Sequence, residues 1–207
     1  GGVWKKNMSN QSVWDNHYTR DRSRQQFPDE NVVRLLRKNF AGERRTLALD
    51  LGTGSGRHLP LLVEHFENVL ACDFSRESLR IAAGDKIQCA QAALPALPFA
   101  SGTFDFILCW GVLHYLEESA LAPAIAAIHE ILKPGAGLFL TLRSDQDSHL
   151  ALQLQRGDLA GGHARLYSKE EALSLFGRFA KVDYGFIARQ PLGEEGLVAH
   201  HMLFARR

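Results

Sequence analysis

The amino-acid sequence predicts an α/β fold built on a mostly parallel sheet. Short apolar runs alternate along the chain with longer amphipathic runs, which is the pattern of βαβ units. The apolar run 47–51 leads directly into an alternating glycine turn, as a buried strand does when it enters a helix beside a ligand. With 207 residues and 45% hydrophobic content, the chain is expected to form a single domain over 1–207.

The first part of the chain is expected to cover the sheet. Residues 3–40 are interpreted as a cap, in which an aromatic and polar stretch precedes an amphipathic helix over 29–40. The first buried strand is expected over 47–51, and the helix after the glycines over 58–66. Pro60 fits the first turn of that helix, because a first-turn N–H has no intrahelical partner.

The alternation of strands and helices continues through the middle of the chain. Ser75 is placed to cap a helix over 76–83, and a second helix is expected to end at the Lys-Pro-Gly motif of 133–135. Further parallel strands are expected at 69–73, 86–90, 104–110 and 138–142.

The last part of the chain predicts a lid, a helix and a hairpin. Residues 144–167 form a long connection, and long connections inside compact domains are usually lids or mobile loops. Ser168 and Glu171 form a capping-box pattern that opens a helix up to residue 176. Two final strands, near 181–187 and 197–205, are positioned to pair antiparallel.

Composition limits the classes of partner. The 24 basic and 23 acidic residues leave a formal charge of +1, so no overall field favours nucleic acid or an anionic membrane. No apolar run approaches the roughly 18 residues of a membrane span, and the N-terminus lacks the apolar core of a signal peptide. Cys72, Cys89 and Cys109 form no metal-binding motif, so no metal is expected and a cytoplasmic location fits best. The expected partner is a small molecule, and the oligomeric state stays open.

The stretch LALDLGTGSGRHLPLL, residues 47–62, predicts a ribonucleoside site. Gly52, Gly54 and Gly56 alternate, and glycine permits both unusual backbone angles and the close approach of a ligand. The helix that follows adds free N–H groups. Asp73 lies at the end of the second strand, 21 positions after Gly52, which suits a carboxylate that accepts two ribose hydroxyls.

Two residues near the glycines count against a dinucleotide. The dinucleotide fingerprint is G-x-G-x-x-G, whereas Arg57 occupies the sixth position of this turn. Asp50 would repel a diphosphate, but its charge suits the ammonium of an amino-acid moiety. An NAD-dependent oxidoreductase is therefore the less favoured enzyme hypothesis.

Four motifs together resemble the class I S-adenosylmethionine-dependent methyltransferases of the small-molecule type. The resemblance covers residues 46–142 and implies S-adenosyl-L-methionine as the cofactor, lying across the carboxyl ends of strands one, two and four. It also implies a Rossmann-like mixed sheet of seven strands, with the last strand antiparallel and helices on both faces. The motifs are ALDLGTGSGRH (48–58), ACDFS (71–75), LPFASGTFDFILCWGVLHYL (97–116) and IHEILKPGAGLFLTL (128–142).

The resemblance assigns roles at the cofactor. Asp50 would face the methionine ammonium, Asp73 would bind the ribose hydroxyls, and Phe74 would pack on adenine. Many family members carry an aspartate where Ala93 stands, so modest affinity is expected. A methyltransferase-like regulatory protein that binds the nucleoside without transfer stays an alternative. The residues implied at the cofactor are Asp50, Gly52, Thr53, Gly54, Gly56, Asp73, Phe74, Ala93, Leu94 and Trp110.

Methyl transfer depends mainly on positioning the acceptor and excluding water. His114 is the candidate general base, because it follows the fourth strand closely and imidazole titrates near neutrality; a packing histidine is the alternative. Arg143 ends the fifth strand, where its guanidinium suits a carboxylate or phosphate on the acceptor. The candidate acceptor-binding residues are Trp14, Tyr18, Arg143 and Tyr167.

Overall fold

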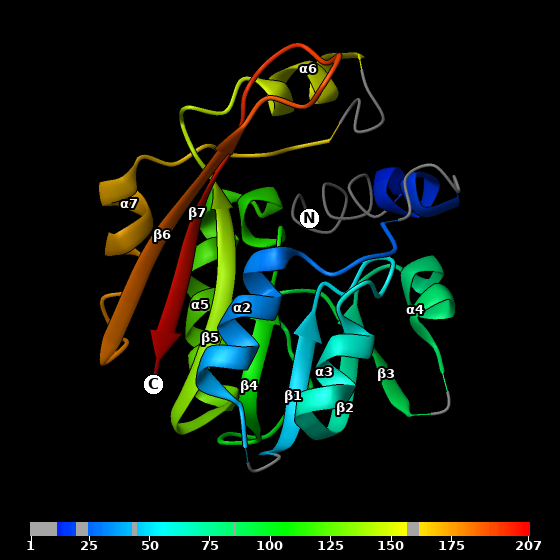
Figure 1. The fold of residues 1–207 in the computed structure, drawn as a ribbon, viewed down its shortest axis with the longest axis vertical. Coiled ribbons are helices and arrows are strands. Elements are labelled where there is room, and N and C mark those ends of the chain that lie inside the picture. The colour runs from blue at the N-terminus through cyan, green and yellow to red at the C-terminus, as the bar shows by residue number, and fades with distance from the viewer. Residues whose placement is uncertain (1–11, 20–24, 43–44, 85, 157–161) are drawn as a thin grey trace.

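A seven-stranded sheet forms the centre of the protein (Figure 1). The structure is a computed structural model that describes residues 12–19, 25–42, 45–84, 86–156 and 162–207. The strand order is β3-β2-β1-β4-β5-β7-β6. The strands are β1 (Arg45–Leu51), β2 (Phe66–Asp73), β3 (Ile87–Gln91), β4 (Phe104–Cys109), β5 (Leu132–Arg143), β6 (Lys181–Arg189) and β7 (Val198–Arg206).

Helices cover both faces of this sheet. The described helices are residues 12–19, here called the N-terminal helix, with α2 (Glu30–Asn39), α3 (Leu59–His65), α4 (Arg76–Ala82), the 3-10 helix η2 (Leu113–Tyr115), α5 (Glu118–Ile131), α6 (His149–Arg156) and α7 (Lys169–Ser174). Side chains of α2, α3 and α4 pack on one face, and side chains of α5 and α7 pack on the other. The predicted α/β class is therefore confirmed.

The order of pairing creates a mixed sheet. Strands β1 to β5 pair in parallel, whereas β7 lies antiparallel between β5 and β6. This arrangement confirms the antiparallel hairpin and the Rossmann-like sheet that the resemblance implies. In its register Arg143, the last residue of β5, pairs with His200 of β7. The carboxyl ends of β1, β2, β4 and β5 consequently meet at one edge of the sheet.

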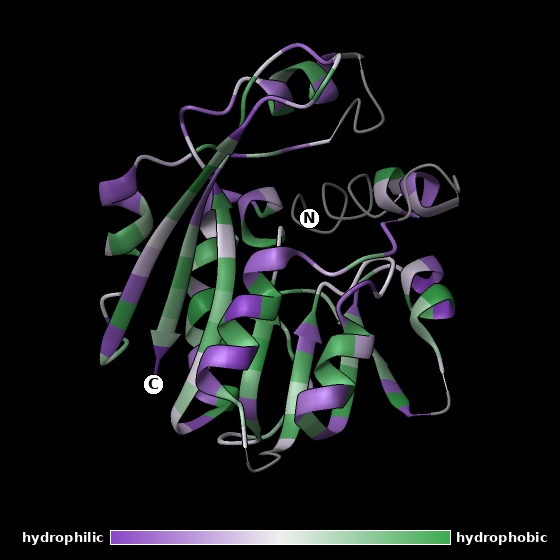
Figure 2. Ribbon diagram, viewed as in Figure 1, coloured by the Kyte–Doolittle hydropathy of each residue, from purple (hydrophilic) through white to green (hydrophobic). Residues whose placement is uncertain are grey.

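Apolar side chains on the two faces hold the layers together. Figure 2 shows hydrophobic central strands and hydrophilic outer surfaces on α2 and α3. On the face covered by α2, the rings of Phe66 and Phe106 stack with centroids 5.5 Å apart, and Phe40 packs against both. The aromatic rings bury large apolar areas, which stabilises the layer without polar contacts.

The structure corrects one local prediction and adds two helices. Strand β5 begins at Leu132 rather than at residue 138, because Leu132 already pairs with Phe104 of β4 and Gly135 donates to the carbonyl of Arg207. The Lys-Pro-Gly motif therefore lies inside the strand. Residues 12–19 form a helix within a stretch that showed no periodicity, and α6 lies within the predicted lid.

Candidate functional site

The glycine turn at the end of β1 is shaped by tertiary contacts. Gly52, Gly54 and Gly56 have φ angles of 76°, 55° and 75°, a region that favours glycine. A Cβ on Gly52 would lie 2.3 Å from Val112, and a Cβ on Gly54 would lie 2.5 Å from the hydroxyl oxygen of Tyr18. The backbone of the first two glycines is thus closely covered by side chains.

The third glycine has a packing role. A Cβ on Gly56 would lie 3.3 Å from the Cα of Ala82, in α4, and 3.0 Å from the side chain of Leu59. A larger residue would push α3 and α4 apart, in addition to the strain of its positive φ. Its predicted contact with the cofactor stays a prediction, while its close packing against α4 is a structural requirement.

Asp73 lies at the end of β2, directly beside the glycine turn. Its carboxylate accepts the N–H of Gly54 and the N–H of Ser75, each at 2.9 Å. Burial raises the pKa of Asp73, and these backbone hydrogen bonds oppose the rise. Each carboxylate oxygen has further lone pairs, so the group can also accept hydrogen bonds from a vicinal diol.

Asp50 is the second buried carboxyl of the site. It is 2% exposed and accepts one hydrogen bond from a side chain, from Oγ1 of Thr53 at 2.8 Å. Burial raises the pKa of Asp50 to about 7; the bond from Thr53 lowers it, and nearby Asp73 raises it further. A cation placed beside this carboxyl would favour its ionised form.

The N-terminal helix lies above these two carboxyls. Figure 1 shows it beside α4, at the carboxyl-end edge of the sheet. Ser75, which caps α4, donates from Oγ to the carboxylate of Asp15. Burial raises the pKa of Tyr18, and the neighbouring Asp73 and Asp50 raise it further. The structure thus places Tyr18, predicted at the acceptor, on the side of Asp50 and Asp73.

The residues predicted around adenine and at the end of β4 differ in how far they are buried. Phe74 is partly buried, and its carbonyl accepts from Nε2 of Gln91 at 3.0 Å. Ala93 is exposed, whereas the side chain of Leu94 packs into the core. The indole of Trp110 packs against Phe139, with ring centroids 5.2 Å apart, so its ring belongs to the α2 and α3 face.

A second polar group surrounds Arg143 at the end of β5. Nη1 of Arg143 donates to Oδ2 of Asp147 at 2.6 Å, and the guanidinium also donates to the hydroxyl of Tyr115. The side chain is 13% exposed, and its Nε is buried with no acceptor among the described residues. Asp147 is held by the N–H groups of Leu150 and Ala199, both at 2.7 Å.

His114 lies beside this group. It is 1% exposed, and its ring centroid is 4.2 Å from that of Tyr115 and 6.5 Å from that of His200. Neither ring nitrogen makes a well-aligned hydrogen bond within the described residues, although the carbonyl of Thr141 is near the ring. Burial lowers the pKa of His114 well below its usual value, and Arg143 lowers it further. The imidazole is therefore neutral at pH 7 and a weak base, so its catalytic role stays a prediction.

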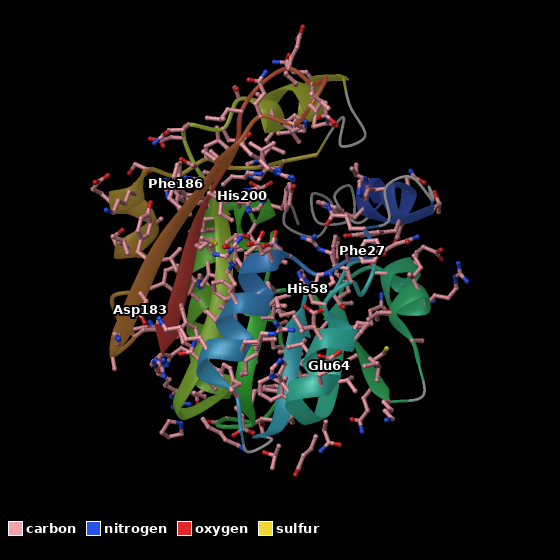
Figure 3. The ribbon with its side chains drawn as sticks, viewed as in Figure 1. Phe27, His58, Glu64, Asp183, Phe186 and His200 are labelled. Atoms are coloured by element: carbon pink, nitrogen blue, oxygen red, sulfur yellow. The ribbon has the colours of Figure 1, made fainter. Side chains whose placement is uncertain are left out.

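His200 gives the Arg143 group a second neutral ring. It lies at the amino end of β7, beside the carboxyl end of β5 (Figure 3). Burial lowers the pKa of His200 to about 4, and the positive charge of Arg143 contributes to this shift. At neutral pH, the imidazoles of both His114 and His200 are therefore uncharged.

The other two predicted acceptor residues lie in different environments. Trp14 lies between the Asp50 and Asp73 pair and the Arg143 group. Its ring centroid is 4.8 Å from that of Tyr115 and 5.8 Å from that of Tyr18. Tyr167 is 1% exposed in the core on the α5 face, and the guanidinium of Arg165 lies over its ring, 5.0 Å from the ring centroid. Its backbone N–H donates to the carbonyl of Arg143 at 2.9 Å. Tyr167 therefore supports the end of β5 through its backbone.

Four residues of the site were not identified from the sequence: Asp15, Tyr115, Asp147 and His200. Tyr115 follows the candidate base His114 directly in the sequence, and this position could have indicated that it lies at the site. His200 becomes visible only when the β5 and β7 register is known. Asp147 looked like one of several polar residues in the predicted lid.

Two classes of site are not found among the described residues. No group of three or more histidine, cysteine, aspartate or glutamate side chains could hold a metal ion. None of the described helices is long and apolar enough to cross a membrane. Cys72, Cys89 and Cys109 are all free thiols.

Comparison with protein families identifies the central part of the chain. A family model described as "Methyltransferase domain" matches residues 48–135. Arginine-hydroxylase NDUFAF5, mitochondrial, of Danio rerio is 30% identical over 166 residues, or 76% of this chain and 51% of that protein. Malonyl-[acyl-carrier protein] O-methyltransferase of Pseudescherichia vulneris is 32% identical over 160 residues, or 73% of this chain and 60% of that protein. The chain spans about half the length of the curated relatives it matches.

A solved structure shares the fold over the whole chain. It is 1,6-didemethyltoxoflavin-N1-methyltransferase of Burkholderia thailandensis, with bound 1,6-didemethyltoxoflavin and S-adenosylhomocysteine. The TM-score is 0.75 at 20% identity, and the match covers 100% of this chain and 91% of that chain. At this identity the likeness establishes the fold.

Proposed function

We propose that this chain, whose residues 48–135 match a family model described as "Methyltransferase domain", is a class I methyltransferase that transfers a methyl group from S-adenosyl-L-methionine to a small molecule. The observation that carries the proposal is the pair of buried carboxyls, Asp50 and Asp73, on either side of the glycine turn. Asp73 is placed for a ribose diol. Asp50, whose pKa is raised to about 7, is placed for the methionine ammonium.

The residues of the chain bind, orient and shield the reacting groups. When bound, the cofactor supplies a methyl group already activated by its sulfonium. We assign Asp50, Thr53, Asp73 and the glycine turn to cofactor binding. Trp14 and Tyr18 cover the site and exclude water, and Arg143 orients the acceptor. Correct orientation of two bound reactants can lower a barrier by about 7 to 11 kcal/mol.

A strong general base is absent from the described residues around Arg143. His114 and His200 both have lowered pKa values, so neither retains a proton well at neutral pH. The proposal therefore favours an acceptor that is nucleophilic without help from a base, or one that releases its proton directly to water. His114 then lines the acceptor pocket as a neutral side chain.

The proposed acceptor is a small molecule, and the location is proposed to be cytoplasmic. The formal charge of +1 provides no strong attraction for nucleic acid. Three free thiols suit a reducing compartment. We further propose that the described part of 3–40 acts as a cap and the described part of 144–167 as a lid, within one methyltransferase domain.

One relative favours a second candidate function. The relative from Danio rerio is named an arginine-hydroxylase, so proteins with related sequences do not all carry a methyltransferase name. A protein that keeps the nucleoside site and does not transfer a methyl group is the alternative, and exposed Ala93 is consistent with weak adenine recognition. Formation of S-adenosylhomocysteine during incubation with an acceptor panel separates the two functions.

Ligand-dependent thermal stability provides the first test. We expect S-adenosylmethionine and S-adenosylhomocysteine to raise the melting temperature and NAD to leave it unchanged. A ligand at about 100 times its dissociation constant adds roughly 2.7 kcal/mol to the free energy of unfolding. Asp73→Ala should lose most of this response, because the variant lacks the carboxylate placed for the ribose.

Asp183→Ala is the matched control. Asp183 is half exposed on β6 and pairs with Lys181, so its loss should leave the ligand response intact. Stabilisation by NAD alone would refute the proposed function. A full response to S-adenosylhomocysteine in Asp73→Ala would show that the ribose is bound elsewhere.

A further inference from the structure

We propose that the methyl acceptor carries a carboxylate and that Arg143 binds this carboxylate through its Nε–H. The inference rests on the proposed function, which leaves the class of acceptor open. The nitrogen atoms of Arg143 differ in their hydrogen bonding. Nη1 donates to Asp147 and the guanidinium also donates to Tyr115, while the buried Nε has no acceptor among the described residues.

A buried donor of a charged group needs an acceptor. Leaving such a group without a hydrogen bond costs about 1 to 3 kcal/mol or more. Asp147 does not serve Nε, because Nη1 occupies its Oδ2 and no hydrogen bond joins Nε to either oxygen of this carboxylate. Asp147 and Tyr115 therefore fix the guanidinium in place and leave its buried Nε–H without an acceptor.

The surroundings of Arg143 match a ligand with a single negative charge. Asp147 balances the charge of the guanidinium, and burial keeps the nearby His114 and His200 neutral. Binding one carboxylate brings the group to a net charge of −1, close to a sulfonium in the proposed cofactor. A phosphate dianion would bring it to −2 in a buried site, which is more costly. A carboxylate oxygen also forms a strong, charge-assisted hydrogen bond with a guanidinium N–H.

Aromatic contacts place Arg143 beside the predicted cofactor site. Tyr115, which accepts from Arg143, packs edge-on against Trp14 at 4.8 Å. Trp14 in turn stacks with Tyr18, whose hydroxyl lies against Gly54 of the glycine turn. An acid held by Arg143 would thus lie under the N-terminal helix, on the side of the Asp50 and Asp73 pair. The amino acids that bind the acid and those that bind the nucleoside are different.

The experiment measures binding at Arg143 directly. The probes are a panel of small aliphatic and aromatic monocarboxylic acids, the matching primary amides, and inorganic phosphate. Melting temperature in the presence of S-adenosylhomocysteine identifies the binders. The ¹⁵Nε–¹Hε NMR signal of Arg143, assigned by its loss in Arg143→Lys, then reports whether a binder accepts a hydrogen bond from this nitrogen.

We expect at least one acid to raise the melting temperature and to shift this signal downfield, while its amide does neither. Arg143→Gln should weaken binding of that acid at least tenfold, and Arg143→Lys, which keeps the charge, should weaken it less. Arg80→Gln is the matched control, because Arg80 is an exposed arginine paired with Glu77 on α4. That variant should bind the acid as the unchanged protein does.

Each other outcome counts against the inference. Equal binding of acid and amide, or no binder among the acids, would overturn it, and stronger binding of phosphate would replace the carboxylate with another oxyanion. S-adenosylhomocysteine binding is measured in parallel on Arg143→Gln. In that variant, retained nucleoside binding together with weakened acid binding supports the inference. In the unchanged protein, nucleoside binding without binding of any acid would refute this inference alone, whereas absence of nucleoside binding would refute the proposed function.

Discussion

Asp50 and Asp105 lie on neighbouring strands, β1 and β4, and their pKa values are shifted in opposite directions. Burial raises the pKa of Asp50 to about 7, against a single bond from Thr53. Burial also favours a higher pKa for Asp105, but hydrogen bonds from Thr46, Lys133 and the N–H of Leu47 outweigh it and lower the pKa. At neutral pH and above, the ionised carboxylate of Asp105 thus stabilises the folded protein, whereas that of Asp50 destabilises it.

Asp50→Asn is expected to stabilise the protein without ligand. Because the folded pKa of Asp50 is raised, the unfolded chain releases its proton first, and the free energy of unfolding falls as pH rises from about 4 to about 7. Asparagine removes this loss and can still accept from Thr53. At pH 8 we expect a gain of about 1 to 3 kcal/mol in denaturant unfolding, vanishing near pH 4. Binding of S-adenosylhomocysteine should weaken.

Asp105→Asn is the comparison for this effect. Its lowered pKa contributes stability above the usual carboxyl pKa, which is lost as pH falls through the folded value. At pH 8 the variant should therefore lose about 1 kcal/mol, with allowance for partial solvent screening. A loss of stability in Asp50→Asn of the same sign would contradict the interpretation of Asp50.

Gly54→Ala tests the close contact between the glycine turn and Tyr18. The φ of 55° costs an alanine about 1 to 2 kcal/mol, and its Cβ would also lie 2.5 Å from the Tyr18 hydroxyl. Gly102→Ala imposes similar strain at a φ of 63°, with no atom within 4 Å. Both variants should be destabilised, but only Gly54→Ala should weaken S-adenosylhomocysteine in calorimetric titration. Equal affinities in the two variants would rule out a ligand-binding role for this contact.

At the scale of elements, the N-terminal helix depends on a few contacts with the site. Asp15 pairs with Ser75 of the α4 cap, Tyr18 covers Gly54, and Trp14 packs on Tyr115. A short helix of this kind is marginal alone and is stabilised by tertiary packing. Opening of the helix therefore breaks few contacts, whereas the five inner strands of the sheet are held by hydrogen-bond ladders on both sides.

Hydrogen exchange is expected to show this difference. Amides of residues 12–19 should exchange much faster than those of β1, β4 and β5, because local opening of the helix breaks few buried contacts. Saturating S-adenosylhomocysteine should slow exchange in residues 12–19, 50–56 and 71–75 by tenfold or more, and leave β6 unchanged. Mass spectrometry of peptic peptides provides the measurement. Unchanged exchange in residues 12–19 would show that the helix does not cover the ligand.

At the scale of the whole molecule, the sheet separates a structural end from a functional end. Asp105 and Lys133 join β1, β4 and β5 near the amino ends of the parallel strands. The buried charges of Asp50, Asp73 and Arg143 lie at the opposite, carboxyl end. Insertion of β7 beside β5 brings His200 to that same end. The candidate site therefore combines residues from most of the chain.

Sequence reasoning alone identified the seven strands, the α-helices other than the N-terminal helix and α6, the glycine turn, the two aspartates beside it and the capping box of α7. Each of these signals is local, since apolar periodicity, capping and glycine spacing act within about ten residues. It also placed Arg143 at the end of a strand. The family resemblance added the antiparallel position of the last strand.

Contacts between residues far apart in the sequence could be identified only from the folded protein. The β5 and β7 register brings Arg143 beside His200, and packing of the N-terminal helix brings Tyr18 onto Gly54. The start of β5 at Leu132 shows the same influence. Helix α5 ends at Ile131, just before the Lys-Pro-Gly motif as predicted, but pairing with β4 outweighs the turn preference of that motif. Burial, and with it the opposite pKa shifts of Asp50 and Asp105, depends on how the layers pack, which no short stretch of sequence specifies.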